Sequence, residues 1–279
     1  MIVANPRKVK LITQSDRKND RLDAEKLARL ARVDPQLLSP IRHRGAEAQM
    51  DLTVIRARAE LVEVRTALIN SARGLVKTSG ERLKQCDADQ VKETTAASLS
   101  EDIRGAIGPL LRSVETISQE IREYDQKIEQ MVKRYPEVAL LTQVYGVGTL
   151  IALTFMLTID DPNRFTHSRE AGPFLGLNPK QRDSGKNRPE LGISKAGDPL
   201  MRSYLVQGAH VILRKGAPDS DLRVWGLAKA GQGKKAKRRA VVGVARKLAV
   251  LLHRLWVTGE VYDPHYQRRA EEAAKKVAA

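Results

Sequence analysis

Two aspartates lie three residues apart near the start of the chain, in the stretch "RKNDRLDAEKLARLAR" of residues 17 to 32. The stretch reads as a helix that opens at about Asn19 or Asp20, and this spacing projects Asp20 and Asp23 to one side of a helix. Three explanations are open: helix capping, a surface salt-bridge face, or half of a metal site whose other half is missing. Carboxylate oxygens are ligands that suit Mg²⁺.

A second candidate for chemistry is Ser184, in the stretch "GLNPKQRDSGKNRPELGISKAGDPLMRSYL" of residues 176 to 205. A serine hydroxyl is a poor nucleophile until a base or a metal lowers its pKa, but nearby cations attract a phosphodiester and stabilise the charge that develops on attack. The alternatives are a solvated Ser-Gly turn, or Ser194 as a competing hydroxyl. The cations around Ser184 are Lys180, Arg182, Lys186, Arg188 and Lys195.

The loop that carries Ser184 is long and has no apolar periodicity. Between Asn178 and Pro199 it holds three prolines, three glycines and five basic residues. Loops of this length are more often functional or disordered than simple connections. Asp198 and Pro199 form a good N-cap and N1 pair, so we expect a helix to start firmly there. A defined helix after a basic loop favours a loop that docks on another molecule.

A further group of cations precedes an amphipathic pattern near the end of the chain. Basic residues at a helix N-terminus oppose the helix dipole, so a bound polyanion explains them better than a solvated helix start. The group consists of Lys234, Lys235, Lys237, Arg238 and Arg239.

Composition agrees with a polyanionic partner. The chain of 279 residues has 49 Lys and Arg against 33 Asp and Glu, a formal net charge of +16, which usually indicates nucleic acid. Aromatic residues make up only 4%, too few for a protein that works mainly by stacking single-stranded bases. The single Cys86 excludes an intramolecular disulfide framework and suits the cytoplasm, and the five scattered histidines form no zinc signature.

Residues 138 to 159, "VALLTQVYGVGTLIALTFMLTI", carry no charge over 22 positions, long enough to span a membrane. Polar residues and glycines interrupt the centre, so we expect a buried helical hairpin and no membrane association. Gly146 and Gly148 also fit a helix-hairpin-helix turn, in which the N–H groups at the next helix start face a phosphate. An ordinary turn between two buried helices has the same pattern.

Two runs with apolar residues at alternating steps of three and four predict a long helix pair between residues 46 and 135. This 3.5-residue period is typical of a coiled coil or an oligomer seam. Pro109 fits the first turn of the second helix. A packed pair inside one domain and self-association through the pair are both open. The apolar positions are Leu52, Ile55, Ala59, Val62, Thr66 and Ile69, then Leu110, Val114, Ile117, Ile121, Tyr124, Ile128 and Met131.

The prediction for the whole chain is a mainly α fold in three parts: residues 1–45, a coiled-coil insertion at 46–135 and a helical domain at 136–279. The first part contains the β-rich run "MIVAN", which stops at Pro6 and has no companion strand nearby in the sequence. A lone strand is an unpaired edge, because strands need partners in a sheet.

The stretches "RKNDRLDAEKLARLA", "YGVGTLIA", "RFTHSREAGPFLGLNPKQRDSGKNRPELGISKAGDPLMRSYL" and "ARKLAVLLHRLW" together resemble the DEDD-type transposases of the insertion sequence 110 family, relatives of the Piv and MooV invertases. The resemblance covers nearly the whole chain from about Asn5. It implies a RuvC-like domain with an RNase H fold, interrupted by a coiled coil and followed by a helical transposase domain with a helix-hairpin-helix-like turn.

The resemblance also implies roles for the two candidate sites. The family's Lys-x-Asp-x-x-Asp-Ala motif falls on Asp20 and Asp23, with Asn19 where the family often has Thr. These aspartates would help to hold Mg²⁺, which would polarise the scissile phosphate and help to activate the serine. The family's serine before glycine falls on Ser184, the nucleophile that becomes covalently linked to DNA. A guide RNA transcribed from the element's flank and a homo-oligomer formed through the coiled coil are further implied partners.

One departure from the family pattern limits this expectation. The family places another Asp and a Glu on earlier strands, whereas the only acid before Asp20 here is Asp16. The RuvC-like part would then be a truncated remnant of one strand and one helix. We expect the chain alone to bind catalytic Mg²⁺ weakly and not to cleave DNA. The alternative function is a non-catalytic nucleic-acid-binding protein.

Overall fold

The described chain is mainly helical, which confirms the predicted fold class. The structure is a computed structural model, and it describes residues 2–5, 8–9, 19–181 and 191–270. Backbone contacts divide the chain into two compact units, Met1–Ala46 and Glu47–Ala279. The finer division into three domains stays a prediction.

The first unit contains α2 (Asp20–Val33) and the 3₁₀ turn η1 (Pro35–Leu38). Asn19 caps α2, because its side chain accepts a hydrogen bond from the backbone N–H of Arg21 at 2.9 Å. In place of the predicted strand "MIVAN", the described residues 2–5 form an isolated antiparallel bridge between Ala4 and Pro40, and the N–H of Ile41 donates to the carbonyl of Val3 at 2.8 Å. The segment that pairs with these residues lies beyond α2 in the sequence, and a strand at "MIVAN" stays a prediction.

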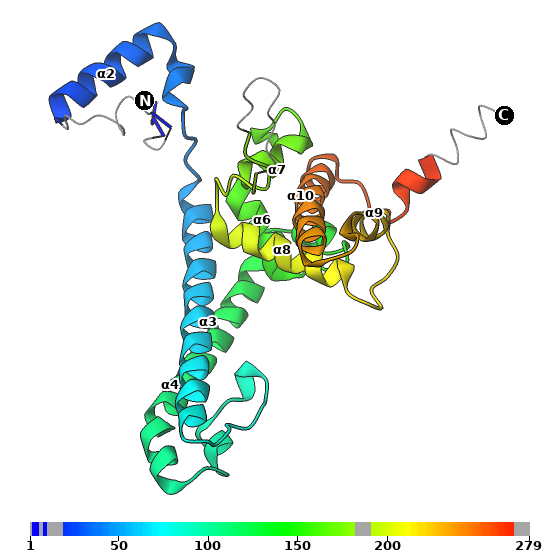
Figure 1. The fold of residues 1–279 in the computed structure, drawn as a ribbon. Helices are drawn as coiled ribbons and strands as arrows, with labels where there is room; N and C mark the ends of the chain where they lie inside the picture. The colour runs from blue at the N-terminus through cyan, green and yellow to red at the C-terminus, as the bar shows by residue number, and fades with distance from the viewer. Residues whose placement is uncertain (1, 6–7, 10–18, 182–190, 271–279) are drawn as a thin grey trace. The chain divides into compact units, whose positions relative to one another are not determined.

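The second unit is built from two long helices and a group of shorter ones (Figure 1). In chain order its elements are α3 (Ala46–Thr78), η2 (Ala88–Gln90), η3 (Glu93–Ala96), α4 (Glu101–Val132), α5 (Val138–Leu141), α6 (Thr149–Ile159), η4 (Pro162–Arg164), η5 (Ser168–Glu170), α7 (Ala171–Phe174), α8 (Pro199–Leu213), α9 (Asp221–Ala230) and α10 (Lys234–Thr258).

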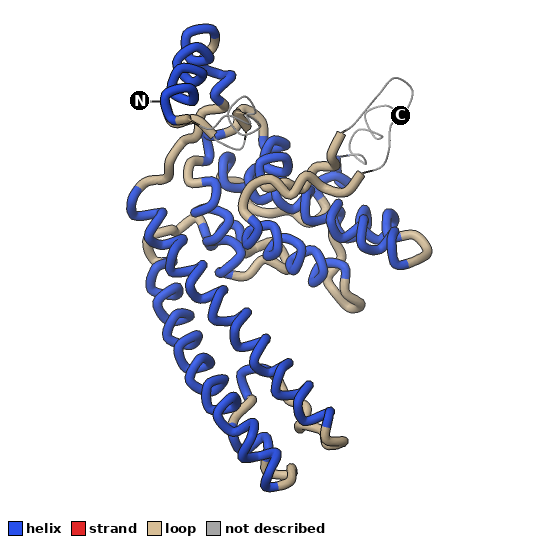
Figure 2. Tube along the Cα trace, turned by 60° about the vertical axis from the view of Figure 1, so that its left-hand side comes forward, coloured by secondary structure: helices blue, strands red, loops and turns tan. Residues whose placement is uncertain are grey.

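The long helices α3 and α4 run side by side (Figures 1 and 2). The sequence predicted Pro109 in the first turn of α4. That prediction was wrong, because α4 begins at Glu101 and Pro109 lies inside it. The buried stripe of α4 includes Leu111 and Ser118, one position beyond the predicted Leu110 and Ile117. Whether the pair forms a coiled coil stays a prediction.

The contact between α3 and α4 is apolar at its two ends and polar in the middle. One end joins the main core through Leu52 and Ile128, and the other forms a separate cluster around Val76 and Leu111. Between these ends Arg58 pairs with Asp125 at 2.9 Å, and Arg65 donates to the Ser118 hydroxyl at 3.4 Å. Polar layers of this kind favour one alignment of two helices over shifted ones, at a cost in stability.

A buried carboxylate fastens the start of α3 to the end of α4. Asp51 is 6% exposed, accepts a hydrogen bond from the Tyr135 hydroxyl at 2.7 Å and pairs with Arg134 at 2.7 Å. Burial and the neighbouring Asp51 raise the pKa of Tyr135 well above its usual range, so its hydroxyl keeps the proton that it donates.

The main core surrounds α6, where every residue from Ala152 to Ile159 is buried. The uncharged stretch therefore folds as the one-turn helix α5, a turn and α6, packed against α8 and α10. Within the part of the chain that the structure describes, no helix is long and apolar enough to cross a membrane.

His253 of α10 is a buried polar group of this core, 1% exposed. Its Nε2 lies 2.9 Å from the carbonyl of Pro162, and its Nδ1 lies 3.0 Å from the Ser168 hydroxyl. Because a carbonyl only accepts hydrogen bonds, Nε2 carries the proton and Nδ1 accepts from Ser168 in a neutral ring. Burial lowers the pKa of His253, since it disfavours the charged imidazolium.

This lowered pKa predicts a pH-dependent stability. The unfolded chain binds a proton at His253 near its ordinary pKa of about 6.5, before the folded chain does. Stability from this residue is therefore complete above about pH 6.5 and is lost as the pH falls below that value. We expect the urea midpoint to fall between pH 7.5 and 5.5, and less steeply in His253→Gln.

The exposed His167 supplies the matched control, because His167→Gln should keep the wild-type slope. An unchanged slope in His253→Gln would contradict the assignment.

Candidate functional site

The loop that carries Ser184 rises from a short, hydrogen-bonded stem. Pro179 and Ile193 form an antiparallel bridge. The N–H of Lys180 donates to the carbonyl of Gly192 at 2.9 Å, and the N–H of Ser194 donates to the carbonyl of Asn178 at 2.8 Å. The stem thus joins residues 176–181 to residues 191–197. Ser184 lies between these two segments in the sequence. It falls outside the described residues, as do Arg182, Lys186 and Arg188.

Two glycines allow the backbone to cross itself at the base of the stem. Gly176 has φ of +71°, and a Cβ there would clash with the backbone of Ala196. Gly197 has φ of +79°, and a Cβ there would clash with the carbonyl oxygen of Phe174. Each position therefore excludes a side chain for two reasons, the positive φ and the close approach. The crossing fixes where the serine loop leaves the helical core.

Charged side chains fasten the same crossing from the outside. The guanidinium of Arg202 donates from Nη1 to the carbonyls of Leu175 and Ala196, both at 3.0 Å. Asp198 caps α8 by accepting from the N–H of Met201 at 2.8 Å, which confirms the predicted helix start. The same carboxylate pairs with Arg56 of α3 at 2.6 Å.

Sequence reasoning missed Arg56 and Arg202. Arg56 is 142 positions from Asp198, and no local pattern marks a contact over that distance. Arg202 lies in the first turn of α8, where the sequence gives no sign that it reaches back to the stem.

The stem also places the other predicted loop residues. The side chains of Lys180 and Lys195 are exposed. Ser194 is tied into the stem through its N–H, and its hydroxyl accepts from the N–H of Ala196 at 3.4 Å. Ser194 therefore has a structural role in the stem, and the choice of Ser184 as the nucleophile stays a prediction.

The two glycines of the predicted hairpin turn occupy different environments. Gly146 has φ of +87°, and a Cβ there would lie 2.8 Å from the carbonyl oxygen of Gly208 in α8. Close packing therefore accounts for Gly146 without any ligand. Gly148 is the exposed N-cap of α6 and has open space around it. Phosphate binding at this turn stays a prediction.

The cationic group at the start of α10 is exposed over its whole length. The helix begins at Lys234 after Gly233, with no side-chain cap. Lys234, Lys235, Lys237 and Arg238 form no ion pair with any described residue. This leaves their charge available to a polyanion.

The aspartate pair lies in the first turn of α2, in the first unit. Asp20 is exposed, and Asp23 is partly buried. The Oδ1 atom of Asp23 is shielded from solvent, accepts no hydrogen bond from the described residues and forms an ion pair with Lys26 Nζ at 3.8 Å. A shielded oxygen without a donor is suited to a cation.

The ligand set around this pair is small. Among the residues that the structure describes, no group of three or more His, Cys, Asp or Glu side chains gathers as a metal site. Asp20 and Asp23 therefore fit Mg²⁺ as two of its oxygen ligands, not as a complete set.

Two family models match separate parts of the chain. The family model described as "Transposase IS116/IS110/IS902 family" matches residues 138–224, which include the serine loop and α8. A DEDD transposase model of the IS110 type matches residues 1–79, which include Asp20 and Asp23.

Three curated relatives align over most of the chain. The transposase for insertion sequence element IS1111A of Coxiella burnetii is 28% identical over 264 residues, 92% of this chain and 71% of the relative. A probable family 20 transposase of Pseudomonas aeruginosa is 29% identical over 269 residues, 93% of this chain and 78% of the relative. A putative transposase of Sinorhizobium fredii is 28% identical over 267 residues, 92% of this chain and 66% of the relative. The chain thus carries two transposase domains of the IS110/IS116 type, one over residues 1–79 and one over residues 138–224.

Proposed function

We propose that the chain is a DNA transposase that breaks and rejoins DNA through a covalent link between Ser184 and a DNA phosphate. The observation that carries this proposal is the fastened stem, which holds both ends of a basic serine loop against the core. A loop with fixed ends can present a nucleophile at a reproducible place, and this is the condition for attack on a phosphodiester.

The proposed reaction exchanges one phosphodiester for another. The Ser184 oxygen attacks the phosphorus, the hydroxyl proton leaves, and the bond from phosphorus to one DNA sugar oxygen breaks as that oxygen takes up a proton. The loop cations Lys180, Arg182, Lys186, Arg188 and Lys195 bind the phosphate and stabilise the charge that develops on it. Because the serine link keeps the phosphodiester energy, a DNA hydroxyl can reverse the step without ATP.

We further propose that Asp20 and Asp23 are two ligands of a catalytic Mg²⁺. When bound, this ion supplies positive charge that polarises a phosphodiester and favours the deprotonated form of a nearby hydroxyl. Asp23 contributes the shielded Oδ1 and Asp20 an exposed carboxylate. Because only two carboxylates gather there among the described residues, binding by the chain alone is weak, and its activity alone is low.

The nucleic-acid surface that we propose has three parts: the loop cations, the helix start at Gly146 and Gly148, and the cluster Lys234, Lys235, Lys237, Arg238 and Arg239. DNA is the principal partner. A guide RNA from the element and self-association through α3 and α4 are further partners of the proposal, supported by the basic charge and by the length of the two helices.

The second candidate is a nucleic-acid-binding protein without catalysis. The exposed cations at the start of α10 support binding whether or not the chain is catalytic. The two candidates share the binding surface and differ in covalent capture, so one assay separates them.

The first prediction of the proposed function concerns covalent capture of DNA by Ser184. The chain is expressed with the native flanks of its gene, cells are lysed in detergent, and DNA bound to protein is collected on filters. A phosphoserine link survives detergent, so we expect adducts in the wild type, at low yield because the proposed Mg²⁺ binding by the chain alone is weak. They should be lost in Ser184→Ala, whereas EDTA added at lysis should leave them intact, because a covalent link that has already formed no longer needs the metal.

Ser194→Ala is the matched control and should retain the adducts. Equal adducts in Ser184→Ala would contradict the nucleophile. DNA binding with no adduct in any variant would favour the second candidate.

The second prediction tests the stem. Gly197→Ala forces an unfavourable φ and a clash with Phe174, which should cost about 1–3 kcal/mol of stability and reduce adduct formation. Gly192→Ala, in the same stem but with nothing within 4 Å of the added Cβ, should behave as the wild type. Thermal midpoints and adduct yields check this, and equal behaviour of both variants would exclude a role for the crossing.

The third prediction concerns the start of α10. Replacement of Lys234, Lys235 and Lys237 by Gln should weaken DNA binding and flatten its salt dependence, by up to about 0.9 in the log–log slope per lost phosphate contact. Fluorescence anisotropy at several salt concentrations measures the slope.

The control replaces three exposed lysines from the far end of the helix pair, Lys77, Lys84 and Lys92, by Gln. If the two triple variants lose the same slope, the effect is one of net charge and the α10 start is not a specific contact.

A further inference from the structure

A cavity of about 680 Å³ lies in the second unit, between α9, α10 and the segment that follows α10. This volume is within the range of small-ligand sites, roughly 300–1,000 Å³. Its floor is apolar and includes Leu222, Val250, Leu251 and Leu255. None of the roles proposed above uses this cavity.

The cavity holds two aromatic rings with a cation over each. Lys247 Nζ lies 4.7 Å from the centroid of the Trp225 ring, and the Arg254 guanidinium lies 4.7 Å from the centroid of the Tyr266 ring. Lys247 and Arg254 are two turns apart on one face of α10, about 10 Å along its axis. With Tyr262, three of the chain's few aromatic residues line this one cavity. Aromatic rings and the flat guanidinium group are the surfaces on which nucleobases stack.

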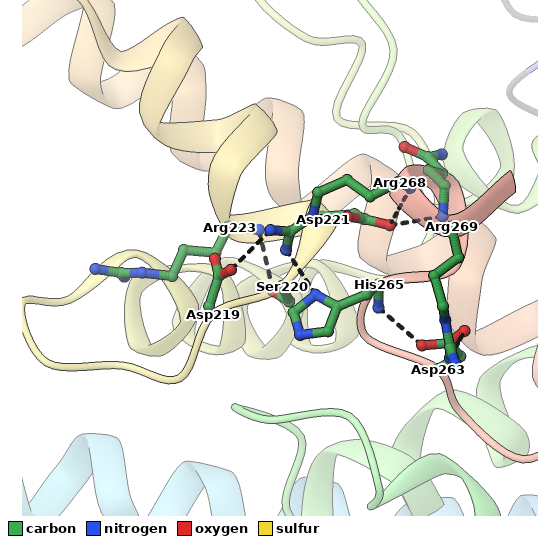
Figure 3. Close-up of polar contacts among 9 residues, drawn as sticks. Asp219, Ser220, Asp221, Arg223, Asp263, His265, Arg268 and Arg269 are labelled. Carbon is green, nitrogen blue, oxygen red and sulfur yellow. Dashed lines mark hydrogen bonds and ion pairs between the residues drawn. The ribbon is translucent and has the colours of Figure 1, made fainter. Parts of the chain in front are cut away.

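The wall formed by the segment after α10 is held by ion pairs, shown in Figure 3. Asp221 accepts from Arg268 Nε at 2.6 Å and from the N–H of Gln267 at 2.7 Å. Arg268 also pairs with Asp219 at 2.8 Å, and Asp263 pairs with Arg269. These contacts give the wall a fixed position and neutralise its carboxylates.

The remaining charge of the cavity is positive. Glu260 pairs with Arg254 at 3.0 Å, so most acids of the lining have a partner. Arg169, Arg246 and Lys247 form no ion pair within the described residues, whereas Glu170 is the one lining carboxylate there without one. An apolar slot with surplus cations at its edge suits a flat, apolar ligand that carries a phosphate.

The cavity adjoins the stem of the serine loop. Asn178 lines the cavity, and its backbone carbonyl accepts the stem hydrogen bond from Ser194. Arg246 also reaches the segment before the stem, since a Cβ on Gly172 would lie 2.9 Å from its Cγ. A strand held at the serine loop can therefore place a neighbouring nucleotide in the cavity.

We propose that this cavity binds one unpaired nucleotide of the DNA strand on which the serine loop acts. The proposal rests on the proposed function of that loop. The base stacks on the Trp225 ring in place of Lys247, which turns to the phosphate beside Arg246, and the Arg254 guanidinium held over Tyr266 offers a second flat surface. The Asn178 and Gln267 amides offer hydrogen bonds to the base edge. A base pair inside a duplex cannot enter, so the site selects unpaired DNA.

Trp225 itself reports on this site. The chain has two tryptophans, and Trp256 does not line the cavity, so Trp256→Phe leaves Trp225 as the single emitter. The probes are a 12-nucleotide oligothymidine and an abasic oligomer of the same length and charge. We expect the oligothymidine to quench Trp225 and to bind roughly tenfold tighter than the abasic oligomer, as one stacked base predicts.

Two separate substitutions test the Trp225 ring and the Arg254 guanidinium, so the test does not fail if one variant does not fold. Trp225→Leu should remove the preference for the oligothymidine and leave affinity for the abasic oligomer unchanged. Arg254→Lys keeps the charge but loses the flat guanidinium, so it should reduce the same preference. These affinities are measured by anisotropy of labelled oligomers. Trp256→Phe is the matched aromatic control and should keep the full preference.

Equal quenching and equal affinity for the two oligomers would overturn the proposal, as would a preference that survives Trp225→Leu. A larger preference for the 12-nucleotide oligouridine would assign the cavity to RNA and overturn the assignment to DNA. This assay needs no cleavage, so a protein that forms Ser184 adducts without base preference would refute the cavity alone. Base preference without adducts would refute only the serine chemistry.

Discussion

The geometry of the candidate site depends on a backbone crossing that only glycine permits. At Gly176 and Gly197 the chain passes so close to Ala196 and Phe174 that a Cβ cannot fit. Such an approach leaves carbonyls without helical partners, and Arg202 satisfies two of them. The loop ends, the start of α8 and the edge of the cavity are all set by this crossing. A change there would move both ends of the serine loop and the start of α8.

In this strongly basic chain, many acidic side chains form internal contacts, whereas several basic side chains face solvent. Many carboxylates act inside the structure: Asp51 joins α3 to the end of α4, Asp198 caps α8, and Asp221 holds the segment after α10. Several lysines and arginines on α10 and around the cavity have no ion-pair partner among the described residues. Because the paired acids cannot neutralise these cations, the positive potential concentrates where a phosphate backbone is proposed to bind.

Local sequence patterns predicted those features of the fold that depend on residues close together in the sequence. The cap at Asp198 and Pro199 and the burial of the uncharged stretch around α6 need only local chemistry, and both were predicted correctly. The companion of Ala4 and the ion pair between Arg56 and Asp198 join distant segments, so periodicity gave no sign of them. In α4 most predicted positions are buried, but Ser118 is buried where Ile117 was predicted, and it accepts a hydrogen bond from Arg65; an apolar pattern does not predict such a polar layer.

The low aromatic content of the chain gave no sign of the proposed stacking site. A low aromatic content argues against a protein that binds nucleic acid mainly by stacking, and for the chain as a whole that argument holds. Stacking energy, however, depends on where rings lie and not on their number: one base gains about 1–3 kcal/mol from a single platform. Trp225 comes from α9 and Tyr266 from the segment after α10, and only the folded chain brings both against one face of α10. A strand bound mainly through its phosphates then needs only one such platform to fix its register, because charge supplies affinity and the ring supplies position.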